Sequence, residues 1–179
     1  MYKALRPLII LCTLFFCQQA AAQTWYAGLK SSPKSIGLEA DLPDSDTAFR
    51  TFYLDADFYG FYSGKNNRPG IKAGYSYNHF LSLNQKESLD ILFYLGSGVS
   101  AGYVYDARPD GIPGAEVALT GTFGWMFRFK RRISLNLSWT LEAGMHIRRT
   151  EDTGNVKLAL YRNGFYRFPY PQLTIIRKF

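Results

Sequence analysis

The chain has 179 residues, 21 of them basic and 14 acidic, with a formal net charge of +7. This length suits one domain, and the modest positive charge is well short of that of a nucleic-acid-binding protein. There are only two histidines and two cysteines. Without a His-x-x-x-His or similar spacing, the sequence predicts no metal site and no cofactor.

Residues 1–22 have the layout of a cleavable secretory signal. Lys3 and Arg6 precede the apolar run LIILCTLFF (8–16), and small residues then lead to the expected cleavage site. The apolar run is too short for a spanning helix. Both cysteines lie in this segment, so the exported domain, residues 23–179, is expected to contain no disulfide, and export makes nucleic acid an unexpected partner.

The exported domain is predicted to contain eight strands, because apolar residues alternate with small or polar ones in eight segments. A period of two places successive side chains on opposite faces of a strand. In chain order the segments are 25–30, 35–42, 49–61, 71–81, 89–105, 116–129, 132–148 and 172–179. None of them shows helical periodicity.

The clearest alternation is RISLNLSWTLEAGMHIR (132–148), in which every second residue from Ile133 to Ile147 is apolar. Strands in globular proteins usually have about 5–6 residues, and this one is more than twice as long. Eight long strands with short connections predict an all-β fold, a closed eight-stranded antiparallel up-and-down barrel.

Strand parity assigns the connections to two ends, because both chain ends of an outer-membrane barrel lie in the periplasm. The predicted periplasmic turns are 43–48, 82–88 and 130–131. The predicted extracellular loops are 31–34, 63–69, 106–114 and 149–169. The longest loop contains Asn163-Gly164, a strong hairpin signal, and is expected to form its own small hairpin.

The barrel is expected to span a membrane, as a transmembrane barrel of the cell outer membrane. The polar face of the strands is mostly Ser, Thr, Asn and Gly, which suit the narrow lumen of eight strands, whereas a face in bulk water would be crowded with Lys and Glu. The apolar face carries large residues that lipid accommodates. A soluble periplasmic barrel that binds a ligand in an apolar interior is the alternative.

The C-terminal segment PQLTIIRKF ends on Phe179. A terminal strand that closes on an aromatic residue is similar to the signal by which outer-membrane barrels are recognised by the barrel-assembly machinery. Arg177 departs from that pattern, since the third position from the end is commonly aromatic or aliphatic.

The stretches SPKSIGLEADL and TGTFGWMFRFKRRISLNLSWTLEAGMHI, with the closing Phe179, resemble an uncharacterised family of small outer-membrane β-barrel proteins, a domain of unknown function, from Gram-negative gut-type anaerobes. The matching positions are Gly37, Leu38, Glu39, Gly124, Trp125, Lys130, Arg131, Glu142 and Gly144. The resemblance covers most of the exported domain and implies a fold and a location without a reaction. It also implies a weak link to fimbrial assembly.

Charged residues of both signs fall on the lumen face and predict a plugging network. The expected members are Glu39, Asp55, Asp57, Lys72, Arg128, Glu142 and Lys178. The competing interpretation is a hydrolase in which Asp55, Asp57 and His146 activate water, but parity places His146 near the outer end, away from the aspartates. A lipid A-modifying enzyme built on His146 and a loop serine lacks a nucleophile motif.

Basic residues gather around the longest loop and predict an extracellular rim that contacts lipopolysaccharide or a surface protein partner, because Arg binds phosphate bidentately. They are Arg148, Arg149, Lys157, Arg162 and Arg167. The alternative is that the basic residues only keep the loop soluble and that the aromatic residues among them anchor the barrel.

The sequence therefore predicts a small non-enzymatic outer-membrane barrel with a plugged lumen, whose rim serves membrane integrity, adhesion or surface assembly. An outer-membrane enzyme and a diffusion pore are the competing classes.

Overall fold

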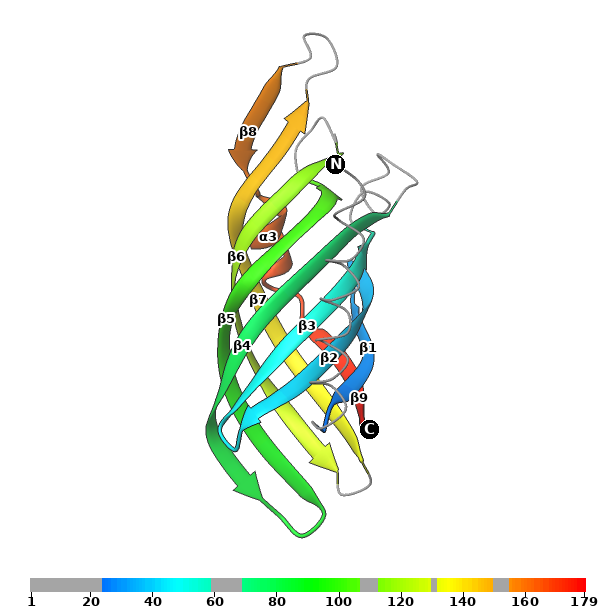
Figure 1. The fold of residues 1–179 in the computed structure, drawn as a ribbon, viewed down its shortest axis with the longest axis vertical. Coiled ribbons are helices and arrows are strands. Elements are labelled where there is room, and N and C mark those ends of the chain that lie inside the picture. The colour runs from blue at the N-terminus through cyan, green and yellow to red at the C-terminus, as the bar shows by residue number, and fades with distance from the viewer. Residues whose placement is uncertain (1–23, 59–68, 107–112, 130–131, 150–154) are drawn as a thin grey trace, which may run out of the picture.

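The computed structural model describes residues 24–58, 69–106, 113–129, 132–149 and 155–179, except the side chain of Arg167. It is an all-β structure in which antiparallel strands close into an eight-stranded barrel (Figure 1). The strands are β1 (Tyr26–Ser32), β2 (Ser35–Ser45), β3 (Ala48–Asp57), β4 (Gly70–Gln85), β5 (Leu89–Tyr105), β6 (Pro113–Phe129), β7 (Ile133–Arg149), β8 (Val156–Leu160) and β9 (Gln172–Lys178). The predicted barrel fold is confirmed.

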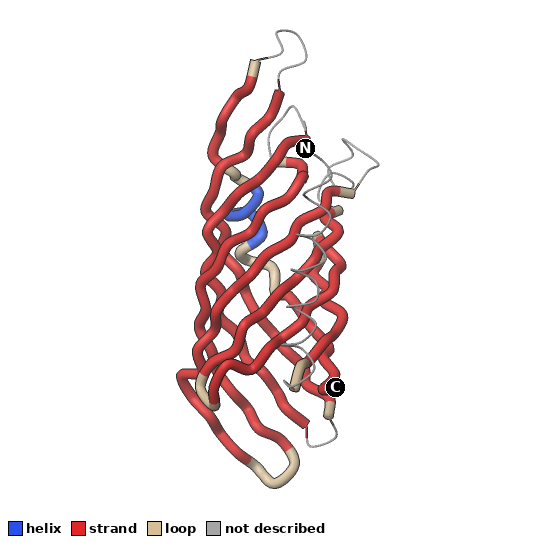
Figure 2. The backbone as a smooth tube through the Cα atoms, viewed as in Figure 1, coloured by secondary structure: helices blue, strands red, loops and turns tan. Residues whose placement is uncertain are grey.

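The strands from β1 to β7 pair with their neighbours in sequence, and β9 closes the wall between β7 and β1. The eighth position of the wall is shared by two strands. β9 pairs with the first part of β7, up to Ser138, and β8 pairs with its last part, from Met145 onward. Between these two ladders β7 faces the short helix α3 (Asn163–Arg167), which is coloured blue in Figure 2.

The two ends of the barrel differ in what they carry. At the end where the C-terminus lies, here called the C-terminal end, the β4–β5 hairpin extends furthest (Figure 1). At the opposite end, here called the β8 end, the tips of β7 and β8 project beyond the other strands (Figure 1). The predicted extracellular loops correspond to the β8 end and the predicted periplasmic turns to the C-terminal end.

The polar face of each strand points into the barrel and the apolar face points out. In β7, Ser134, Asn136 and Ser138 are buried, whereas Leu141 and Met145 are exposed. The long alternation therefore has a direct structural cause: every second side chain lies in a narrow interior, and the others form the outer surface.

Several predicted connections differ from the observed ones. β4 continues to Gln85, so the predicted turn at 82–88 shrinks to residues 86–88. The expected hairpin at Asn163-Gly164 is wrong, because α3 begins there instead. Residues 1–22 of the expected signal, Lys130-Arg131, most of the predicted loops at 63–69 and 106–114, and residues 150–154 of the predicted loop at 149–169 lie outside the described residues.

Candidate functional site: the barrel interior and its two ends

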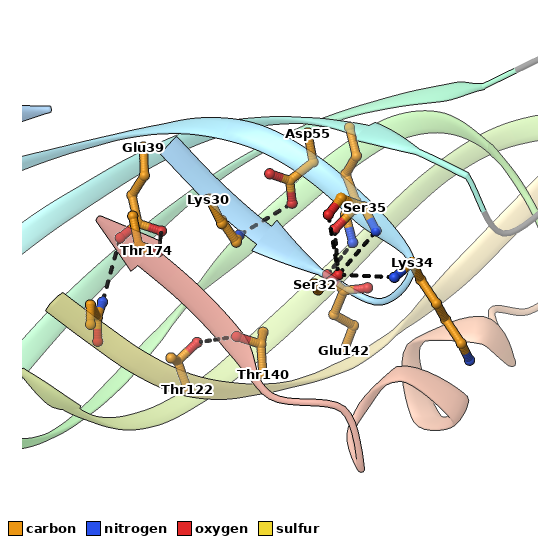
Figure 3. A network of polar contacts seen from close by, with 12 residues as sticks. Lys30, Ser32, Lys34, Ser35, Glu39, Asp55, Thr122, Thr140, Glu142 and Thr174 are labelled. Atoms are coloured by element: carbon orange, nitrogen blue, oxygen red, sulfur yellow. Dashed lines mark hydrogen bonds and ion pairs between the residues drawn. The ribbon is translucent and has the colours of Figure 1, made fainter. Parts of the chain in front are cut away.

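Two buried ion pairs cross the interior in the half toward the β8 end. The Lys72 ammonium on β4 pairs with the Glu142 carboxylate on β7. The Lys30 ammonium on β1 lies 3.2 Å from a carboxylate oxygen of Asp55 on β3 (Figure 3), and 3.7 Å from the centre of the Tyr53 ring. Each pair joins strands that are not neighbours: the Lys72–Glu142 pair spans β5 and β6, and the Lys30–Asp55 pair spans β2.

Uncharged groups donate hydrogen bonds to other buried carboxylates. Glu39 accepts a hydrogen bond from the Thr174 hydroxyl at 3.2 Å (Figure 3). It accepts another from the Asn136 amide at 3.4 Å. The Thr51 hydroxyl donates to Asp41 at 2.6 Å. Seven buried carboxyl groups face only two buried lysines among the described residues. Hydroxyl and amide donors are therefore a necessary part of the network, because a buried charge without partners is costly.

The middle of the lumen is filled by side chains. Lys30, Glu39, Tyr53, Asn78 and other residues line a cavity of about 20 Å³, which has room for about one water molecule. Across this level the hydroxyl groups of Thr122 and Thr140 are hydrogen-bonded at 3.1 Å (Figure 3).

An apolar cluster closes the lumen toward the C-terminal end. Phe49, Leu92, Tyr94 and Met126 are buried together, and Phe80 packs against them. The Phe49 ring stacks on Phe80 at 4.8 Å and meets the edge of Tyr94 at 5.2 Å. We call these five residues the floor. The sequence pattern, which predicts a polar lumen, gives no sign of this apolar cluster.

The residues considered for catalysis have structural partners. Asp55 is paired with Lys30, and Asp57 is buried at the end of β3. The Nε2 atom of His146 lies 3.1 Å from the carbonyl oxygen of Val104, and the imidazole stacks near the Tyr161 ring at 6.3 Å. These contacts position each group within the barrel wall and interior.

The segment around α3 docks onto the inside of the wall. The backbone N–H groups of Arg162 and Asn163 donate to the same carboxylate oxygen of Asp106, at 2.9 and 3.0 Å. The Tyr161 N–H donates to the carbonyl oxygen of Gly144 at 2.9 Å. Tyr161 and Asn163 are completely buried as a result.

Gly164 allows the closest approach in this segment. A Cβ atom at Gly164 would lie 2.3 Å from the carbonyl oxygen of Glu142, which no side chain tolerates without a shift. On the other side of α3, the Lys34 ammonium in the β1–β2 turn donates to the carbonyl oxygen of Tyr166 at 3.2 Å. α3 thus occupies the part of the wall that β8 and β9 leave open.

The structure brings five of the seven predicted network residues into the buried interior: Glu39, Asp55, Asp57, Lys72 and Glu142. The other two lie elsewhere. Arg128 is half-buried below the floor, with its guanidinium 4.9 Å from the centre of the Phe80 ring. Lys178 is exposed at the C-terminal end.

The interior also buries further polar and charged residues, namely Lys30, Asp41, Asp106, Glu116 and His146. The alternation of residues along each strand is sufficient to place most of these residues in the interior. Lys30 alternates with Gly28 on β1, and Glu116 precedes the first apolar residue counted in β6. Glu116 accepts a hydrogen bond from the Ser100 hydroxyl at 2.8 Å.

The predicted rim residues lie around the β8 end. Arg148 on β7 is directly opposite Lys157 on β8, in a cross-strand pair of like charges. Arg149, Lys157 and Arg162 are exposed. The side chain of Arg167 lies outside the described residues.

Phe179 packs at the opposite end. Its ring stacks on Trp25 with 4.7 Å between centroids, and its N–H donates to the Trp25 carbonyl oxygen at 2.9 Å. These contacts tie the last residue to the residue before β1. Its recognition by an assembly machinery stays a prediction.

No group of three or more His, Cys, Asp or Glu side chains is arranged to hold a metal ion in the described part of the chain. Among the helices that the structure describes, none has the length and apolar character needed to cross a membrane.

The resemblance to a family of small outer-membrane barrels also stays a prediction. Comparison with models of protein families, with curated proteins and with solved structures finds no match for this chain.

Proposed function

We propose that the protein spans the outer membrane as a small β-barrel. The supporting observation is the reversed polarity of the barrel. Ion pairs and amides lie inside, while Leu119, Leu29 and Ile71 on the outer surface are 69%, 64% and 63% exposed. Large exposed apolar surfaces mark contact with a membrane or a partner, and β9 closes the wall between β1 and β7, as strands that span a membrane require.

The strand lengths suit this role. β5, β6 and β7 have 17 residues each, which corresponds to roughly 55 Å of strand at about 3.3 Å per residue. A strand tilted by about 45° then rises roughly 40 Å, more than the apolar band of about 25 Å in an outer-membrane barrel.

The first test is the mobility of the full chain on a gel after extraction in detergent. An intact membrane barrel is expected to migrate differently before and after boiling, and to need detergent to stay in solution. Monodisperse protein in plain buffer would contradict the proposal and support a soluble barrel. A soluble ligand-binding barrel needs an apolar cavity, whereas this interior is polar and its central cavity holds about 20 Å³.

We propose further that the barrel neither conducts nor catalyses. The ion pairs fill the half toward the β8 end and the floor fills the other, so no continuous water path is expected. Planar bilayers containing the protein should show no unitary conductance steps.

A lumen enzyme is tested by His146→Gln and Asp55→Asn. If these variants insert normally and leave lipid A and proteolysis profiles unchanged from wild type, that result supports a non-enzymatic barrel, and a lost activity would favour the hydrolase class.

The function is then expected to reside at the β8 end, in membrane integrity, adhesion or assembly of surface structures. The exposed side chains of Lys157 and Arg162 favour an anionic partner, because basic side chains form charge-assisted hydrogen bonds with phosphate. Lipopolysaccharide phosphate is the expected ligand. The double variant Lys157→Gln/Arg162→Gln should bind lipopolysaccharide less tightly than wild type, whereas Lys86→Gln at the other end should not. Equal binding by all three proteins would remove this role.

A further inference from the structure

A second basic site lies at the C-terminal end of the barrel, far from the predicted rim. Arg128, Arg132 and Lys178 line a pocket of about 390 Å³ together with the Ser134 hydroxyl. Three aromatic residues, Tyr26, Phe129 and Phe179, complete its lining. We call this the mouth pocket. Its size is that of a site for a small molecule or a lipid headgroup.

Three elements bring the cations together. Arg128 lies near the end of β6, Arg132 precedes β7, and Lys178 is the last residue of β9. Their backbones are tied, because Arg128 is opposite Ser134 in the β6–β7 ladder and the Lys178 N–H donates to the Arg132 carbonyl oxygen at 2.9 Å.

The backbone of Arg132 is in an unusual conformation. Its φ of 67° makes it the only non-glycine residue with positive φ in the described chain. This left-handed region is uncommon for residues with a side chain. The hydrogen bond from Lys178 holds Arg132 in place at the edge of the pocket.

None of the three cations forms an ion pair with another of the described residues. Arg128 contacts the Phe80 ring and the Met126 sulfur instead, and the Lys178 ammonium lies 6.0 Å from the centre of the Tyr26 ring. Asp41, near Arg128 in an adjoining small pocket, is bonded to Thr51. Two carboxylates lie beside Arg128: Asp90 is its cross-strand partner, and Asp41 interacts with it electrostatically. Arg132 and Lys178 have no ion-pair partner among the described residues, and an added anion would reduce their repulsion.

We propose that the mouth pocket binds the phosphate group of an anionic phospholipid from the adjacent membrane leaflet. Arg and Lys supply charge-assisted donors to phosphate, and the Ser134 hydroxyl supplies a further donor. A lipid fits better than free phosphate because the rings extend the pocket toward the outer apolar surface, where Phe129, Ile133 and Phe179 are exposed. This inference rests on the proposed membrane location.

The test uses the full chain, folded in zwitterionic detergent and titrated with a short-chain phosphatidylglycerol. The parallel titrations use the corresponding phosphatidylcholine and inorganic phosphate. Wild type should bind phosphatidylglycerol at least tenfold more tightly than either, and the affinity should fall as sodium chloride is raised from about 50 to about 500 mM, because the contact is ionic.

The variant Arg132→Gln/Lys178→Gln changes two exposed side chains and should weaken phosphatidylglycerol binding at least tenfold. Lys86→Gln, an exposed lysine in the β4–β5 turn at the same end, is the matched control and should bind like wild type. Unboiled gel mobility and circular dichroism show that each variant is folded.

Equal affinity for the two lipids, or wild-type binding by the double variant, would overturn the proposal. Inorganic phosphate that binds as tightly as phosphatidylglycerol would overturn the assignment to a lipid. In each of these outcomes the protein would still migrate differently before and after boiling. A failure of the lipid-binding proposal can therefore be distinguished from a failure of the proposed membrane location.

Discussion

Lys72 and Glu142, which are 70 residues apart in the sequence, form an ion pair across the lumen from β4 to β7. Both side chains are almost completely buried, with 2% and 4% exposure. Since the strands that carry them are separated by β5 and β6, the pair fixes the width of the barrel as well as neutralising its own charges.

Removing one partner of this pair should be more harmful than removing both. Lys72→Met leaves the Glu142 charge buried with fewer partners, and should lower the free energy of unfolding by roughly 3–5 kcal/mol. Adding Glu142→Gln to that variant should restore part of the loss. Urea unfolding in detergent micelles, followed by tryptophan fluorescence, measures both effects.

Lys86→Met provides the control for a lost lysine, because Lys86 is exposed in the β4–β5 turn. It should change the free energy of unfolding by less than about 0.5 kcal/mol. Additive losses for Lys72→Met and Glu142→Gln would show that the two side chains do not interact energetically.

A charge on the outer face should be costly in proportion to its depth in lipid. Leu119 lies near the middle of β6 and is 69% exposed. In lipid vesicles, Leu119→Arg should destabilise the barrel by roughly 2–4 kcal/mol, as expected near the bilayer midplane. Leu83→Arg, near the β4–β5 turn, should cost about 0–1 kcal/mol. Reversible unfolding in vesicles compares the two, and equal small costs would speak against lipid around β6.

The floor should depend on Phe49 more than on its neighbour on the same strand. Phe49 points inward and is 2% exposed, whereas Phe52 is 43% exposed on the outer face. Phe49→Ala should lower the free energy of unfolding by roughly 3–5 kcal/mol, the usual cost for a buried ring. Phe52→Ala should cost clearly less. The prediction fails if denaturant titration gives the opposite order.

The docking of α3 should depend on the acceptor oxygen of Asp106. Asp106→Ala removes the acceptor of the Arg162 and Asn163 N–H groups, and should cost about 0.5–2 kcal/mol, as for a lost helix cap. Asp106→Asn keeps a side-chain oxygen and should lose less. Hydrogen exchange at residues 161–167 should be faster in the alanine variant, and unchanged exchange would mean that other contacts hold this segment.

The alternation of residues was enough to predict the barrel, because in a narrow closed sheet the face of each side chain follows directly from its position. β7 illustrates this, with Ser134 and Glu142 inside and Ile133 and Met145 outside. The same parity placed Lys72 and Glu142 in the lumen. It gave no indication that they pair, since that depends on the stagger of strands far apart in the sequence.

The sequence pattern does not predict the floor or α3, for two different reasons. In the run DILFYL, Leu92 and Tyr94 share the parity of Asp90 and are buried, whereas Leu95 is exposed. Parity does not show that they meet Phe49 and Met126 from other strands. At Asn163-Gly164 the local preference for a hairpin is overridden by a distant residue, because Asp106 receives the N–H groups that begin α3.

The eighth position of the wall is divided between β8 and β9, and this makes it the most weakly paired part of the barrel. β9 meets β1 and β7 through six residue pairs each, whereas β5 and β6 share seventeen. Under heat or mechanical load the wall should therefore unzip along β9 first, leaving β1 to β7 as one curved sheet. The short final strand thus holds the barrel closed, and α3 fills the gap in the wall between β9 and β8.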